Sequence, residues 1–133
     1  MLRILVVDDN ADHRFLTQRV LKGLAPEVPL AVDFAEDGEA GLERLQGELP
    51  DLVLLDIKMP RKDGFDVLEA VRKDPRTAAL PVIMFTSSEV GADVDRARAL
   101  GASDYVAKPL DAKSFAEGLR ACVLRWARRL GRA

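Results

Sequence analysis

Residues 52–56 of the chain are Leu-Val-Leu-Leu-Asp, and residues 4–9 are Ile-Leu-Val-Val-Asp-Asp. Each apolar run has the length and the branched side chains of a strand that is buried on both faces. Each run ends in a carboxylate, and an ionised carboxylate is rarely buried without a partner or a metal. The two segments therefore predict a buried sheet with a polar site at the ends of its strands.

The same pattern recurs twice, because one apolar run stops at Thr86 and another stops at Lys108. Helical periodicity separates the apolar runs. We expect strands at 2–7, 30–35, 51–56, 81–86 and 104–107, with helices at 11–24, 37–45, about 65–73, about 94–100 and 111–129. Five alternating β–α units predict an α/β fold, a parallel sheet with helices on both faces. Ligands of such sheets lie at the carboxyl ends of the strands.

Composition narrows the class of protein. A chain of 133 residues, 48% of them hydrophobic and 32% charged, fits one domain spanning 1–133. The net charge of −2 argues against a nucleic-acid binder, and a lone cysteine, Cys122, excludes an internal disulfide and a cysteine metal cage. No secretory signal pattern is present, and no apolar run approaches the ~20 residues that cross a membrane. We expect a cytoplasmic protein without membrane association.

The acids at the strand ends predict a metal site. Asp8, Asp9 and Asp56 would repel one another if all were ionised, and a bound divalent cation reverses that repulsion. Mg²⁺, or Mn²⁺ in its place, prefers such oxygen ligands. Lys108 and Thr86 add an ammonium and a hydroxyl, and this combination suits phosphoryl transfer. A carboxylate can itself be the nucleophile, which gives an aspartyl phosphate.

Five motifs together resemble the receiver domain of two-component response regulators. They are Asp8-Asp9-Asn10, residues 54–60 (Leu-Leu-Asp-Ile-Lys-Met-Pro), Asp63-Gly64, Thr86-Ser-Ser88 and residues 101–109 (Gly-Ala-Ser-Asp-Tyr-Val-Ala-Lys-Pro). The resemblance covers nearly the whole chain and implies a flavodoxin-like strand order of 2-1-3-4-5. It also implies that Asp56 accepts a phosphoryl group from a sensor histidine kinase.

The resemblance assigns further roles. It implies that Asp8, Asp9, Asp56 and the main-chain carbonyl of Lys58 hold the metal. It implies that Thr86 is the switch hydroxyl and that Tyr105 is the switch aromatic. Lys108 matches the family's lysine. The resemblance also implies a cis peptide bond between Lys108 and Pro109, and only before proline is the free-energy cost of a cis bond small. His13, the single histidine, is expected to lie in solvent without a direct role.

The function expected from this resemblance is a stand-alone receiver that has no DNA-binding domain and changes its protein-binding surface for an unknown downstream protein. A phytochrome-like kinase is one expected partner. A phosphorelay intermediate is the rival within signalling, and a phosphate-independent interaction module is a third reading. An Asp-nucleophile hydrolase is disfavoured because Lys58 stands where such enzymes need a second acid.

The end of the chain is the candidate output surface. From Asp111 onward six basic residues stand against two acids. The extended helix over about 111–130 continues its apolar stripe to Trp126 and Leu130, which we expect to pass the sheet and to form an exposed patch for a partner or a homodimer. Gly118 stands where receivers joined to DNA-binding domains usually carry an arginine for dimer ion pairs, which argues against that particular dimer.

Overall fold

The fold is a five-stranded parallel sheet between two layers of helices. The computed structural model describes residues 1–87, 91–108 and 111–132. The elements are β1 (Leu2–Val7), α1 (Ala11–Leu24), β2 (Leu30–Ala35), α2 (Gly38–Arg44), β3 (Leu52–Leu55), α3 (Gly64–Lys73), β4 (Val82–Thr86), α4 (Gly91–Ala99), β5 (Asp104–Ala107) and α5 (Ala112–Arg129). The strand order is β2-β1-β3-β4-β5, which confirms the predicted α/β architecture and its flavodoxin-like order.

The register of the sheet aligns the ends of the central strands. Val7 of β1 pairs with Leu55 of β3, and Leu55 pairs with Met84 of β4. All four pairings are parallel. The residues that follow these strands therefore meet at one edge.

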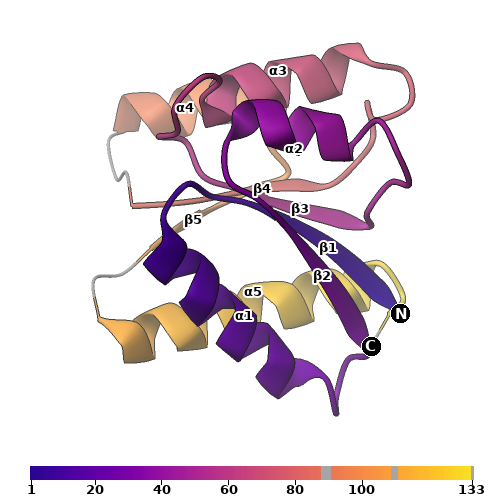
Figure 1. The fold of residues 1–133 in the computed structure, drawn as a ribbon, viewed down its shortest axis with the longest axis vertical. Helices are drawn as coiled ribbons and strands as arrows, with labels where there is room; N and C mark the ends of the chain where they lie inside the picture. Colours follow the sequence, from indigo (N-terminus) through magenta and orange to yellow (C-terminus); the bar gives the residue numbers. More distant parts are fainter. Residues whose placement is uncertain (88–90, 109–110, 133) are drawn as a thin grey trace.

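Two hydrophobic cores lie on opposite faces of the sheet. Figure 1 shows α1 and α5 against one face and α2, α3 and α4 against the other. Along β1, Ile4 and Val6 belong to the first core, whereas Leu5 and Val7 belong to the second. Because successive strand residues point to opposite faces, a strand covered on both sides must be apolar throughout. This is why β3, residues 4–7 of β1 and residues 82–85 of β4 are uninterrupted apolar runs, whereas Arg3 near the start of β1 is exposed.

Side-chain caps set the starts of four helices. Asn10, Asp37, Asp63 and Asp111 each accept a hydrogen bond from a main-chain N–H in the first turn of α1, α2, α3 and α5 respectively. An acceptor at this position satisfies one of the N–H groups that a helix start leaves without a partner. Asn10 stands three residues after the end of β1 and Asp63 eight residues after the end of β3, and a helix starts at each cap.

The end of α5 differs from the expectation of an exposed apolar patch. Trp126 is only 7% exposed and belongs to the core between α1, α5 and the sheet, and Leu130 packs against that core. The indole Nε1 donates to Asp104 at 3.2 Å, and the Arg129 guanidinium covers the ring at 4.5 Å from its centroid. The expectation was wrong because Trp126 belongs to the same core as Val28, a buried residue in the connection between α1 and β2.

The exposed aromatic residue lies elsewhere. Phe15 of α1 is 60% exposed. The Arg19 guanidinium lies 5.9 Å from its ring centroid. Within the described ranges, no helix combines the length and apolar character that crossing a membrane requires.

Candidate functional site

The sheet ladder delivers the site residues to one edge. The main-chain N–H of Asp8 donates to Ala35 at 3.0 Å, and that of Asp56 donates to Val7 at 3.0 Å. The N–H of Lys108 donates to the carbonyl of Thr86 at 2.7 Å. These residues therefore continue the strand pairing by one step, and their side chains start from a rigid backbone.

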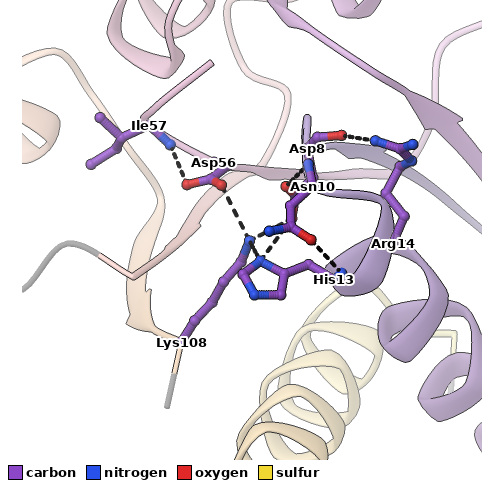
Figure 2. A network of polar contacts seen from close by, with 7 residues as sticks. All are labelled: Asp8, Asn10, His13, Arg14, Asp56, Ile57 and Lys108. Atoms are coloured by element: carbon purple, nitrogen blue, oxygen red, sulfur yellow. Dashed lines mark hydrogen bonds and ion pairs between the residues drawn. The ribbon is translucent and has the colours of Figure 1, made fainter. Parts of the chain in front are cut away.

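The ammonium of Lys108 joins the two buried carboxylates (Figure 2). Its Nζ donates to Asp8 Oδ2 and, at 3.2 Å, to Asp56 Oδ2. The lysine side chain is 2% exposed, and those of Asp8 and Asp56 are 4% and 9% exposed. Two buried carboxylates thus share one buried cation, which leaves an excess negative charge.

Main-chain N–H groups hold the other oxygen of each carboxylate. Asp8 Oδ1 accepts from Asn10 N at 3.0 Å, and Asp56 Oδ1 accepts from Ile57 N at 2.7 Å. Burial raises the pKa of Asp8 above its ordinary value and outweighs the lowering effect of Lys108, while the charge of Asp56 raises it further. Among the described residues no buried side-chain nitrogen or oxygen lacks a hydrogen-bond partner.

Three acids form a group suited to a cation. One carboxylate oxygen from each of Asp8, Asp9 and Asp56 lies within 4.8 Å of the others. Asp9 is exposed, so this side of the group is open to solvent. An all-oxygen donor set with an open side fits a hard divalent ion that keeps part of its water shell. The excess negative charge of the buried carboxylates favours such an ion.

Lys58 and the loop around it complete this edge. The Lys58 side chain is exposed and does not belong to the acid group. Arg61, whose φ is 68°, donates to Asp37 at 2.5 Å, and Gly64 N donates to Ile57 O at 2.7 Å. A Cβ at Gly64 would lie 2.2 Å from the carbonyl oxygen of Asp56, so only glycine allows α3 to start this close to the site.

The expected switch residues lie on the last two strands. Thr86 ends β4 and is fully buried. Tyr105 is half-buried on β5, pairs with Met84, and packs against the core under α2, α3 and α4. The expected cis bond before Pro109 lies outside the described residues, as does Ser88.

His13 is the site residue that sequence reasoning missed. It was expected in solvent, but its side chain is 33% exposed, and Nδ1 lies 3.2 Å from Lys108 Nζ and 4.0 Å from Asp8 Oδ2. The neighbouring Arg14 donates to the carbonyl of Asp8 at 2.8 Å. The sequence feature that could have located His13 is the Asn10 cap. This cap starts α1 directly beside the acids and places His13 in the first turn.

Comparisons with known proteins agree with this geometry. The family model described as response regulator receiver domain matches residues 4–120. Protein PilH of Pseudomonas aeruginosa is 34% identical over 121 residues, which cover 91% of this chain and 97% of PilH. Probable transcriptional regulator ycf27 of Guillardia theta is 37% identical over 123 residues, 92% of this chain but 46% of that protein. The chain thus spans less than half the length of that curated relative.

Solved structures show the same fold. The Mn²⁺-bound form of response regulator Rcp1 superposes with a TM-score of 0.87 at 28% identity, covering 95% of this chain and 94% of that one. The phosphorylated cyanobacterial phytochrome response regulator RcpA superposes with a TM-score of 0.89 at 26% identity, covering 94% and 93%.

Proposed function

The chain belongs to the response regulator receiver domain family, the phosphorylation-activated switches of two-component signalling, and we propose that Asp56 is its phosphoryl acceptor. The observation that supports this assignment is the placement of Asp56 beside the buried ammonium of Lys108 and within the group of three acids. A carboxylate beside a fixed cation at the open edge of a parallel sheet can receive charge that develops on a phosphoryl group.

In the proposed reaction the donor is a phosphohistidine of a sensor histidine kinase. A carboxylate oxygen of Asp56 attacks phosphorus, the phosphorus–nitrogen bond breaks, and the leaving imidazole takes a proton. Lys108 then donates to a phosphoryl oxygen, and the Thr86 hydroxyl donates to another. Slow attack by water on the aspartyl phosphate would return Asp56 to its carboxylate form.

The proposed cofactor is Mg²⁺, with Mn²⁺ as a substitute. Asp8, Asp9, Asp56 and the main-chain carbonyl of Lys58 would hold it, and when bound it would neutralise charge on the phosphoryl oxygens. The described acid group supports a divalent ion at this place, and the neighbouring Rcp1 structure is a Mn²⁺-bound form.

The proposed readout runs from Thr86 to Tyr105. Movement of Thr86 toward the phosphoryl group would free space for Tyr105, which the register places on the neighbouring strand. A change in the β5 surface would then alter binding of a downstream protein. We propose residues 1–133 as one receiver unit that works in the cytoplasm, by analogy with the nearly full-length match to PilH.

A surface beside the site suits the kinase. A groove of about 350 Å³ between α1 and α5 is lined by residues that include Leu16, Val20 and Phe115, and the exposed Phe15 precedes it on α1. An exposed aromatic residue next to a groove is a typical protein-binding anchor. The likeness to a phytochrome response regulator supports a phytochrome-like kinase as the partner.

Dimerisation through α5 is a further proposal. Because Trp126 is buried, such an interface would have to use the exposed side chains of this helix, such as Arg128 and Arg129. Light scattering with and without beryllofluoride tests it, and a monomer under both conditions excludes it.

Labelling with acetyl phosphate and Mg²⁺ tests the acceptor. Asp56→Asn should abolish the labelling, whereas the matched control Asp12→Asn, which alters an exposed acid on α1, should label like the wild type. Intact-protein mass spectrometry measures the added phosphoryl group. Full labelling of Asp56→Asn would refute the assignment.

A further inference from the structure

We infer that His13 is a positioning residue, whose imidazole holds the ammonium of Lys108 in the orientation that the phosphoryl group requires. The contact is between His13 Nδ1 and Lys108 Nζ, at 3.2 Å (Figure 2). The catalytic part of this inference rests on the proposed function, whereas the contact itself does not.

The direction of the hydrogen bond follows from chemistry. An ammonium carries three N–H donors and no acceptor, so Nδ1 must be the acceptor in this contact. The ring proton is then on Nε2. A histidine in this tautomer presents a lone pair to the ammonium of Lys108.

The three N–H donors of Lys108 have three acceptors on three different elements. Asp8 follows β1, Asp56 follows β3, and His13 lies in the first turn of α1. Three acceptors in different directions leave the ammonium no free rotation about its last bond. The lysine side chain is 2% exposed, so these three acceptors surround the ammonium in place of bulk solvent.

The imidazole itself is well supported. The main-chain N–H of His13 donates to the Asn10 cap at 3.0 Å, which anchors this turn of α1. The ring lies 6.0 Å from the ring of Phe115, centroid to centroid, and Phe115 is buried in α5. The histidine is therefore a rigid acceptor.

The contact with His13 matters most when Asp8 and Asp56 exchange their bonds to Lys108 for other partners. A phosphoryl oxygen on Asp56 would take one N–H of Lys108, and a metal would draw charge from Asp8. The hydrogen bond from Lys108 to His13 is affected neither by phosphorylation of Asp56 nor by a metal at Asp8. It is therefore the contact that keeps the ammonium in the same orientation during the reaction. Without it, the buried lysine must reorient or leave one donor unsatisfied, which is unfavourable.

Three variants separate the acceptor from the ring. His13→Asn keeps an oxygen near the place of Nδ1, His13→Phe keeps the ring against Phe115 without an acceptor, and His13→Ala removes both. We expect phosphorylation by acetyl phosphate and Mg²⁺ to slow about tenfold in the Phe and Ala variants, corresponding to about 1.4 kcal/mol of barrier. The Asn variant should stay within about twofold of the wild type, because it retains an acceptor for the charged donor.

A phenylalanine variant as fast as the wild type, or an asparagine variant as slow as the phenylalanine variant, would overturn the inference. A second measurement is independent of turnover. Since the chain has one histidine, the ¹⁵N spectrum of its imidazole has a single pair of ring signals. Lys108→Met should move the Nδ1 signal, and an unchanged signal would exclude the contact.

The two proposals fail differently. If the wild type takes no label, the proposed function fails, while the ¹⁵N spectrum still decides the contact. If the wild type takes label and all three His13 variants match it, only the role of His13 is lost.

Discussion

Replacing Lys108 by methionine tests the electrostatics of the site most directly. The substitution conserves length and apolar volume but removes the cation that Asp8 and Asp56 share. Removing one partner of a buried ion pair typically destabilises a protein by about 3–5 kcal/mol. In the variant, protonation of one carboxylate limits the loss of stability, because neutralising a carboxyl of ordinary pKa 3.8 at pH 7 costs about 4 kcal/mol. We therefore expect the free energy of unfolding to fall by about 3 kcal/mol.

The assay is urea unfolding followed by circular dichroism, at pH 7 without divalent ions. Lys58→Met is the matched control, since it removes an exposed lysine at the same edge and should change stability by about 0.5 kcal/mol or less. Adding Mg²⁺ should stabilise Lys108→Met more than the wild type, because the ion then replaces the buried cation that the substitution removes.

The pH dependence gives a further check with a definite sign. Without Lys108 the folded state holds its carboxyl protons more tightly than the unfolded state does. The penalty of the variant is therefore largest at neutral pH and shrinks as pH falls toward 3.8 and the acids become neutral. A loss below about 1 kcal/mol at pH 7, or equal stabilisation of both proteins by Mg²⁺, would refute this account of the site.

Two further predictions concern the scaffold. Gly64→Ala should destabilise the fold by about 2 kcal/mol or more and slow acetyl phosphate labelling, because its Cβ would collide with the Asp56 carbonyl. Gly118→Ala is the matched control, because a Cβ there meets nothing within 4 Å. Urea unfolding of this control should show a gain in stability of about 0.5–1 kcal/mol. Burial would raise the pKa of Asp104, but bonds from Arg125 and Trp126 outweigh it and lower the pKa. Asp104→Asn should therefore lower the free energy of unfolding by about 1 kcal/mol at pH 7. This difference from the wild type should disappear as pH falls through the lowered pKa, and a loss of stability that persists at pH 2 would contradict the prediction.

The sequence predicted the sheet and the acid group because both depend on local patterns. A strand buried on both faces must be apolar, and parallel strands bring their carboxyl ends to one edge, so Asp8, Asp56, Thr86 and Lys108 could be placed together. The order of the strands came from the family resemblance, since periodicity does not order strands.

The errors arise where neighbouring elements decide the outcome. Helical periodicity predicts which face of a helix a residue lies on, but it does not predict how far along the helix the neighbouring elements pack against that face. Trp126 was therefore expected outside the core that in fact contains it. His13 was assigned to solvent because only the fold brings the first turn of α1 against Lys108, 95 residues later in the chain.

The burial of Trp126 also gives the chain a built-in optical probe. It is the only tryptophan, and its indole donates to Asp104, the residue of β5 that precedes Tyr105. Indole emission depends on the local field, and here that field includes the Asp104 carboxylate and the Arg129 guanidinium. A shift of β5 that accompanies phosphorylation would thus change the fluorescence of the unlabelled protein, so the switch can be followed in real time without an added dye.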